Sequence, residues 1–358
     1  MGLSCGLVGM ASCGKTVVFN AITAAGVPSH DTAGMNRAIV PVPDSRVARL
    51  AAMYHPQKTV PSTLEVVDIP GIKAASGAGR GFRSLGFIKD TEALLHVVRC
   101  FDDGTVPFEY STIDPKRDVE TVDLELMAAD SVTLENKISR IERKARSGDK
   151  ETARDLAACQ KVRAAIQQGI PARRQGLSTQ ELAAVRDCNL ASLKPVLYVA
   201  NVKSVADGGN GHVATLRELA RSENAEVVLV CGKDEADISQ LDEKDRPEFM
   251  RELGLNESSM ERLLTAAYRM LGLISFFTVG EDEVRAWTCR RGDKAPAAAG
   301  KIHSDMEKGF IRMEVMRYDD LIELGSEAAV AKAGRQRVEG RDYEVKDGDI
   351  VSVRFGRG

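Results

Sequence analysis

A short glycine-rich segment near the start of the chain constrains the fold most. Residues Gly9–Thr16 carry the pattern G-x-x-x-x-G-K-T, between an apolar run at Cys5–Val8 and an amphipathic run at Val17–Ile22. A strand, such a loop and a helix in this order form a phosphate-binding loop, because the glycines let backbone N–H groups turn toward phosphate oxygens. The positive end of the helix points at the same anion. We expect Lys15 to reach the terminal phosphates and the Thr16 hydroxyl to bind magnesium.

Composition leaves room for several domains and excludes some classes of protein. The chain has 358 residues, which suits two or three domains. Its formal net charge of −3 gives no global attraction to nucleic acid or anionic lipid, so we expect no DNA and no membrane partner. Seven scattered cysteines without a C-x-x-C pair indicate reduced thiols. With no signal-peptide layout and no long apolar run, the sequence predicts a cytoplasmic protein.

Apolar runs that alternate with helical segments predict an α/β fold. Continuous apolar runs between helices indicate a parallel sheet covered on both faces. The runs are Cys5–Val8, Leu64–Val67, Leu94–Val98, Pro195–Ala200 and Val227–Val230. Between the third and fourth runs, residues 119–168 have helical spacing on a charged background, with a break at Ser147-Gly148-Asp149. This pattern predicts an inserted helical hairpin, with two surface helices of the main domain as the alternative.

The pattern of strand and helix signals changes again from about Phe276. Val284–Thr288 and Phe310–Met316 have the composition of strands, and Pro296–Ile302 begins a helix that Gly309 can close. Residues 343–355 predict a hairpin that turns at 346–349. The order favours a small mixed sheet wrapped on one helix.

A second motif, D-x-x-G at Asp68–Gly71, follows the second apolar run. At the end of a strand downstream of a phosphate loop, such an aspartate holds magnesium through water, and the glycine amide bonds the terminal phosphate. Ile72 stands where many GTPases carry a water-orienting glutamine, so we expect slow hydrolysis or another catalytic group. Arg80 and Arg83 lie in a glycine-rich stretch that is either a switch loop or a plain exposed loop.

The base-reading positions follow the fourth and fifth apolar runs. Asn201 begins the tetrapeptide Asn-Val-Lys-Ser, whereas a guanine-specific site carries Asn-Lys-x-Asp. Ser204 has no carboxylate to accept from guanine, so guanine selectivity is not supported. Cys231 and Gly232 occupy the usual place for backbone contacts to a base. Cys13, inside the phosphate loop, is either a reactive thiol or simply a small residue that fits.

These motifs give a defined set of candidate residues. Lys15 and Gly71 are the expected catalytic groups, and Thr16 and Asp68 the expected magnesium ligands. The expected nucleotide-binding residues are Gly9, Ser12, Cys13, Gly14, Lys15, Thr16, Val17, Asn201, Val202, Cys231 and Gly232.

Nine segments of the sequence match one known family. They are Gly9–Thr16, Val40–Asp44, Val67–Gly71, His96–Phe101, Lys194–Val202, Glu248–Leu255, Glu283–Trp287, Ala299–Arg312 and Glu339–Asp349. On these segments, and over nearly its whole length, the chain resembles the YchF family of Obg-related P-loop NTPases. The resemblance implies a G domain (residues 1–117 and 193–275), an inserted helical domain (118–192) and a C-terminal TGS domain of β-grasp type (276–358).

The chain departs from the family pattern at three places. Ser12 replaces an asparagine of the phosphate loop, and Ser204 replaces the glutamate of the family's Asn-x-x-Glu. The first switch is shortened to about residues 29–36, where Thr32 is the candidate switch threonine and third magnesium ligand. The phosphate-binding motif is thus retained, whereas the motifs for the first switch and for base recognition are not.

The function that the resemblance implies is that of a regulatory switch. We expect a Mg²⁺-dependent nucleoside triphosphatase with slow basal turnover that prefers ATP. Its expected partner is the ribosome, through ribosomal RNA or protein. A nucleotide-binding scaffold with little or no hydrolysis is the first alternative, and a GTPase is the second. The sequence leaves the oligomeric state open.

Overall fold

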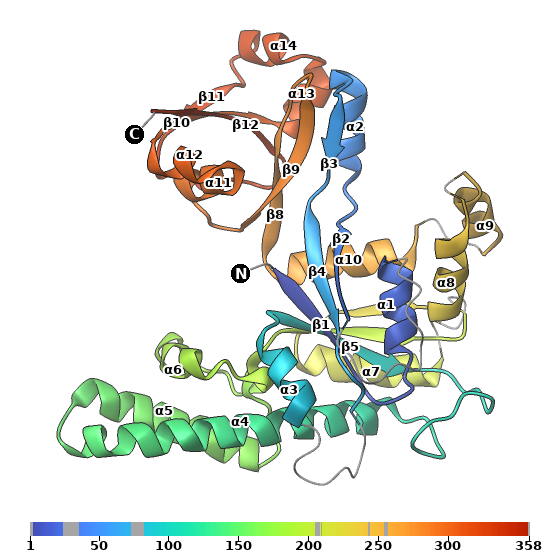
Figure 1. Ribbon diagram of the computed structural model, residues 1–358, viewed down its shortest axis with the longest axis vertical. Coiled ribbons are helices and arrows are strands. Elements are labelled where there is room, and N and C mark those ends of the chain that lie inside the picture. The colour runs from blue at the N-terminus through green and yellow to red at the C-terminus, as the bar shows by residue number, and fades with distance from the viewer. Residues whose placement is uncertain are drawn as a thin grey trace. The chain divides into compact units, whose positions relative to one another are not determined.

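The structure, a computed structural model, describes residues 3–23, 36–72, 82–204, 208, 210–242, 244–253 and 257–356. The chain forms two compact units (Figure 1). The first unit contains Met1–Ile39 and Glu65–Ala266, and the second contains Val40–Leu64 and Ala267–Gly358.

The first unit is built on a six-stranded sheet. Its strand order is β2-β4-β1-β5-β6-β7. The strands are β1 (Ser4–Val8), β2 (Asn36–Pro41), β4 (Thr63–Asp68), β5 (Ala93–Arg99), β6 (Val196–Asn201) and β7 (Val227–Val230). β1 pairs in parallel with β4 and β5, and β6 pairs in parallel with β5 and β7. All five predicted apolar strands are confirmed, and β2 is an additional strand that the sequence pattern did not reveal.

This parallel arrangement positions the motifs. The carboxyl ends of parallel strands meet at one edge of a sheet, where loops of different strands converge. The phosphate loop follows β1, the D-x-x-G motif follows β4, and the two base-reading segments follow β6 and β7. The helices of this unit are α1 (Lys15–Thr23), α3 (Phe82–Lys89), α7 (Gly211–Ser222), α8 (Gly232–Gln240) and α9 (Arg246–Glu252). One further helix, α10 (Ser259–Met270), begins in the first unit and ends in the second.

The inserted helical hairpin is confirmed. α4 (Pro115–Arg146) and α5 (Lys150–Gln167) lie side by side, joined by the predicted break (Figure 1). Asp114 caps α4 by accepting from two backbone N–H groups, and Pro115 occupies the first turn, where a missing N–H costs nothing. A short helix, α6 (Thr179–Val185), and three 3₁₀ turns, at Ala172–Arg174, Arg186–Cys188 and Ala191–Leu193, complete the insert.

The second unit holds a mixed six-stranded sheet. Its order is β11-β10-β12-β8-β9-β3. The strands are β3 (Lys58–Val60), β8 (Leu273–Thr278), β9 (Glu283–Arg290), β10 (Phe310–Arg317), β11 (Arg337–Glu339) and β12 (Asp349–Phe355). The helices are α2 (Ser45–Tyr54), α11 (Ala295–Ile302), α12 (Ser304–Lys308), α13 (Tyr318–Leu324) and α14 (Glu327–Lys332). The alanines of α11 pack against Phe276 and Met313, as expected for a sheet wrapped on a helix.

Of two local predictions in this unit, one is partly confirmed and one is wrong. A helix begins one residue before the predicted Pro296 and Gly309 ends α12, but the helix is interrupted at His303, which is extended and whose ring nitrogen caps α12 by accepting from Asp305 N–H. The predicted hairpin does not form: residues 343–345 form no strand, and Val345 N–H donates to the carbonyl of Asp293. This loop bonds to a neighbouring loop in place of β12.

Residues 40–64 group differently from the sequence-based division, which counted them with the G domain. β3 pairs in parallel with β9, from Lys58 opposite Glu283 to Val60 opposite Arg285. Val47 and Leu50 of α2 are buried in a core cluster with Phe277. Backbone pairing and apolar burial therefore place this segment in the second unit, and the domain boundaries at 117, 192 and 275 stay predictions.

Candidate nucleotide-binding site

The backbone of the phosphate loop requires glycine at two positions. Gly9 and Gly14 have φ values of +152° and +102°. A Cβ on Gly9 would lie 2.4 Å from the carbonyl oxygen of Val97, and one on Gly14 would lie 2.2 Å from Nδ2 of Asn201. Ser12 is left-handed as well, at φ +59°. Both glycines are therefore required by crowding as much as by conformation.

Lys15 lies folded against its own loop. Its Nζ donates to the carbonyl oxygens of Gly9 at 3.1 Å and Met10 at 2.8 Å, and the residue is 6% exposed. The predicted partner Gly71 is close, because a Cβ there would lie 2.9 Å from Lys15 Nζ. The structure thus brings together the two residues for which we predicted catalytic roles.

Backbone bonds tie the phosphate loop to the D-x-x-G loop. Ala11 N–H donates to the carbonyl of Ile72 at 2.9 Å, and Ile72 N–H donates to the carbonyl of Gly9 at 3.1 Å. Ile72 itself is buried, at 8% exposure. An apolar, buried side chain cannot orient the attacking water, so Ile72 does not replace the glutamine that many GTPases carry here.

Thr16 and Asp68 come together as the predicted magnesium pair. The Thr16 hydroxyl donates to Oδ2 of Asp68 at 3.2 Å. Burial raises the pKa of Asp68, although Lys15 and hydrogen bonds from Thr16 and Asn36 lower it. A hydroxyl beside a carboxylate whose charge is poorly solvated is a donor set that suits Mg²⁺, a cation that prefers oxygen ligands. Thr32 lies outside the described residues.

Asn36 is a residue of this site that sequence reasoning missed. It begins β2, and its side chain hydrogen-bonds Asp68. No motif signals it, because the shortened first switch has no recognisable pattern around it.

Asn201 braces the site from β6. Its Nδ2 donates to the carbonyl of Cys13 at 3.0 Å, and its Oδ1 accepts from Gly232 N–H at 3.3 Å. The side chain thereby joins the phosphate loop to the start of α8. Gly232 also contacts α1, since a Cβ there would lie 3.2 Å from Cγ1 of Val17.

The remaining base-reading candidates follow the same two strands. Val202 is 2% exposed, and its N–H donates to the carbonyl of Val230 at 2.9 Å. The Cys231 thiol donates to the carbonyl of Lys203 at 3.2 Å. These contacts hold the segments after β6 and β7 against each other at the edge of the sheet.

The idea of a reactive thiol at Cys13 is not supported. Cys13 is 1% exposed, and burial raises its pKa more than the neighbouring Lys15 lowers it. A small buried residue that fits the loop is the better account. All seven cysteines are buried free thiols.

Within the described part of the chain, no three His, Cys, Asp or Glu side chains cluster as metal ligands, and no helix is long and apolar enough to span a bilayer.

Comparison with known proteins decides the family. The chain is 43% identical to the ribosome-binding ATPase YchF of Bacillus subtilis (strain 168), covering 99% of this chain and 100% of the relative. It is 42% identical to the ribosome-binding ATPase YchF of Escherichia coli O157:H7, covering 99% of each. The chain belongs to the YchF family.

Family profiles and a solved structure agree with this membership. Residues 273–356 match the YchF-GTPase_C profile, described as a protein of unknown function, and residues 4–141 match a profile described as 50S ribosome-binding GTPase. The fold is similar to that of the Schizosaccharomyces pombe YchF GTPase, with a TM-score of 0.87 and 31% identity over 99% of this chain and 98% of that one. The predicted fold class, a P-loop G domain with a helical insert and a C-terminal domain, is confirmed.

Proposed function

We propose that this YchF protein is a magnesium-dependent ATPase that acts as a slow, nucleotide-controlled switch on the ribosome. The observation that carries the proposal is the convergence of Lys15, Thr16 and Asp68 at the carboxyl edge of the parallel sheet. The names of its full-length relatives, ribosome-binding ATPases, support both the nucleotide and the partner.

The phosphate chain would be bound by the loop and its lysine. Backbone N–H groups of Gly9–Thr16 and the start of α1 present positive charge, and Lys15 Nζ neutralises the terminal phosphates. Gly71, with no side chain between its backbone and Lys15, lets its amide approach the same phosphate. This pairing gives the site a means to distinguish a triphosphate from a diphosphate.

Magnesium would be held by the Thr16 hydroxyl and, through water, by Asp68. When bound, it would neutralise charge on the phosphate oxygens. Its positive charge would relieve the cost of burying the Asp68 carboxylate, the same burial that raises the pKa of that group.

Turnover is expected to be slow. Ile72 is buried and cannot position the attacking water. Arg80 and the side chain of Arg83, the candidate cations, lie outside the part of the chain that the structure describes. The same observation favours a second candidate function, a nucleotide-binding scaffold with little or no hydrolysis.

The proposed base preference is for ATP. Ser204 offers no carboxylate to guanine, so GTP gains no bidentate contact at this position. The proposed location is the cytoplasm, in keeping with seven free thiols.

One set of measurements separates these functions. Isothermal titrations with ATP, GTP and their diphosphates, with and without Mg²⁺, give the ligand, and steady-state turnover gives the activity. Co-sedimentation with ribosomes in ATP and in ADP tests the switch. Lys15→Ala should weaken nucleotide binding by roughly ten- to a hundredfold. Lys116→Ala, which changes an exposed lysine of α4, should leave nucleotide binding intact. Tight ATP binding without turnover would favour the scaffold, and no ATP binding would refute both functions.

A further inference from the structure

Two neighbouring strands lead from the magnesium pair to the second unit. β2 begins at Asn36, whose side chain hydrogen-bonds Asp68 at the end of β4. Beyond their other ends, Val42 N–H donates to the carbonyl of Ser62 at 2.8 Å. The two strands are neighbours in the sheet, and because Asn36 bonds to Asp68 while Val42 bonds to Ser62, they run in opposite directions. We call β2 and β4 the β2–β4 ribbon.

The chain between these strands is built into the second unit. After β2, α2 buries Val47 and Leu50 beside Phe277, and β3 then forms the edge of the sheet by pairing with β9. The ribbon is thus continuous at one end with the candidate nucleotide site and at the other with a segment folded into the C-terminal sheet.

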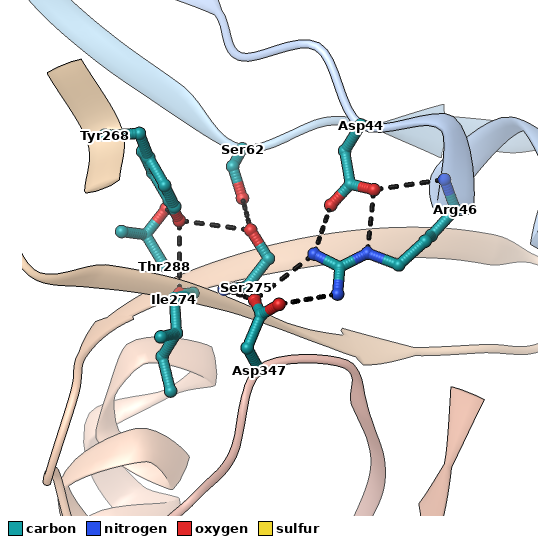
Figure 2. A network of polar contacts seen from close by, with 8 residues as sticks. All are labelled: Asp44, Arg46, Ser62, Tyr268, Ile274, Ser275, Thr288 and Asp347. Carbon is teal, nitrogen blue, oxygen red and sulfur yellow. Dashed lines mark hydrogen bonds and ion pairs between the residues drawn. The ribbon is translucent and has the colours of Figure 1, made fainter. Parts of the chain in front are cut away.

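Arg46 fastens this segment through a double carboxylate bridge (Figure 2). Its guanidinium donates to both oxygens of Asp44 at 2.9 and 2.8 Å, and to both oxygens of Asp347 at 2.8 and 3.2 Å. It also lies 5.1 Å from the ring centre of Phe277. Such forked pairing is specific to arginine, because a lysine offers no planar pair of donors.

The second partner of the bridge is fixed in turn. Oδ1 of Asp347 accepts from the backbone N–H of Ser275 on β8 at 3.0 Å, and Gly348 N–H donates to the Ser275 carbonyl at 2.9 Å. Asp347 is therefore bonded to the central part of the C-terminal sheet and to α2 at once.

A hydroxyl cluster makes a further attachment at the start of β4 (Figure 2). The Ser62 and Ser275 hydroxyls lie 3.3 Å apart, and Tyr268 Oη lies 3.1 Å from the same Ser275 oxygen. Tyr268 also donates to Thr288 Oγ1 at 2.9 Å. The segment is thereby held at both of its ends, by Arg46 after β2 and by Ser62 before β4.

We propose that the Arg46–Asp347 bridge couples the C-terminal unit to the nucleotide site through the β2–β4 ribbon. The inference rests on the proposed function. Displacement of Asp68 and Asn36 when ATP and magnesium bind is carried along the ribbon to α2 and, through Arg46, to the C-terminal sheet. Coupling is reciprocal, so a partner that binds the C-terminal unit changes ATP affinity by the same factor.

Amide hydrogen exchange of the full-length protein, with and without ATP and Mg²⁺, tests the coupling. In the wild type we expect nucleotide to slow exchange in the phosphate loop and also in residues 42–62 and 343–349. Arg46→Ala and Asp347→Asn should keep the response of the phosphate loop and lose that of the C-terminal unit. Arg335→Ala, which removes two surface ion pairs, to Asp320 and Glu323, in the same unit, is the matched control and should behave as the wild type.

The possible results are distinct. Asp347→Asn keeps the shape of the side chain and an acceptor for Ser275, so it carries the test if Arg46→Ala does not fold. A wild-type protein that protects its phosphate loop but not its C-terminal unit would overturn the coupling and leave the proposed function standing. An unchanged exchange response in both Arg46→Ala and Asp347→Asn would also overturn the coupling. A wild-type phosphate loop that does not respond to ATP would refute the proposed function itself.

Discussion

The hydroxyl of Thr16 donates to the carboxylate of Asp68 across 3.2 Å, joining the end of the phosphate loop to the start of the D-x-x-G loop. Both groups are oxygen donors, and one is an anion held at 7% exposure. Thr16→Val removes the hydroxyl at nearly constant shape, so the dependence of ATP affinity on Mg²⁺ should fall by about tenfold or more. Titration of Mg²⁺ at fixed ATP measures this. Thr16→Ser keeps the hydroxyl and should behave as the wild type, and an unchanged Mg²⁺ dependence in Thr16→Val would remove Thr16 from the metal site.

Asp68 should lower stability in the absence of ligand. Its pKa is near 3.9 in an unfolded chain and raised in the folded protein, so between these values the folded state binds more protons and its stability falls as pH rises. Above the folded value the cost is constant. Asp68→Asn should therefore raise the free energy of unfolding at pH 7 by about 0.5–1 kcal/mol while abolishing stabilisation by Mg²⁺ and ATP.

Denaturant unfolding of the wild type and of Asp68→Asn at pH 4 and pH 7 tests whether the carboxylate lowers stability. The advantage of Asp68→Asn should be smaller at pH 4, because more of the wild-type carboxyl is protonated there than at pH 7. An Asp68→Asn protein that is less stable at both pH values would mean that the bonds from Thr16 and Asn36 outweigh burial.

Asn201 should support the loop more than it reads the base. Asn201→Ala leaves the Cys13 carbonyl and the Gly232 N–H without their partner, at a cost of about 1–3 kcal/mol for a buried polar group. We expect ATP and GTP affinities to fall together, with their ratio unchanged. Competition titrations with both nucleotides measure that ratio. A selective loss of one nucleotide would assign base reading to Asn201.

Because position 204 is a serine, we expect no preference for guanine. Any preference of the wild type for GTP over ATP should stay below about tenfold, or 1.4 kcal/mol. Ser204→Asp should raise the GTP/ATP affinity ratio, because its carboxylate can accept from guanine. A lysine at Val202 would complete a guanine motif, but Val202 is 2% exposed and the charge would be buried at a large cost. Ser204→Asp alone is therefore the cleaner test. A wild-type preference for GTP above about tenfold would contradict the expected lack of guanine selectivity.

The sequence predicted what local patterns encode. The five apolar strands and the break between α4 and α5 follow from hydrophobic runs and from turn residues, and the loop from Gly9 to Thr16 follows from a fixed motif. These signals are contained within a few residues, so they do not depend on the rest of the fold.

Contacts between distant segments could not be predicted in this way. Nothing around Lys58 indicates that it pairs with Glu283, more than 200 residues away, and nothing around Arg46 indicates Asp347. The hairpin expected at 343–355 was wrong for the same reason: Val345 bonds to Asp293, a partner that the turn residues do not reveal.

The direct test of the account is the affinity of Lys15→Ala for ATP in the presence of Mg²⁺. Lys15 is the residue whose charge we expect to neutralise the terminal phosphates, on which both binding and turnover depend. Loss of its charge-assisted contact should cost about 1.5–3 kcal/mol, or roughly ten- to a hundredfold in affinity, with folding intact by circular dichroism. Wild-type affinity in Lys15→Ala, measured by isothermal titration, would contradict the assignment of Gly9–Thr16 as the nucleotide site.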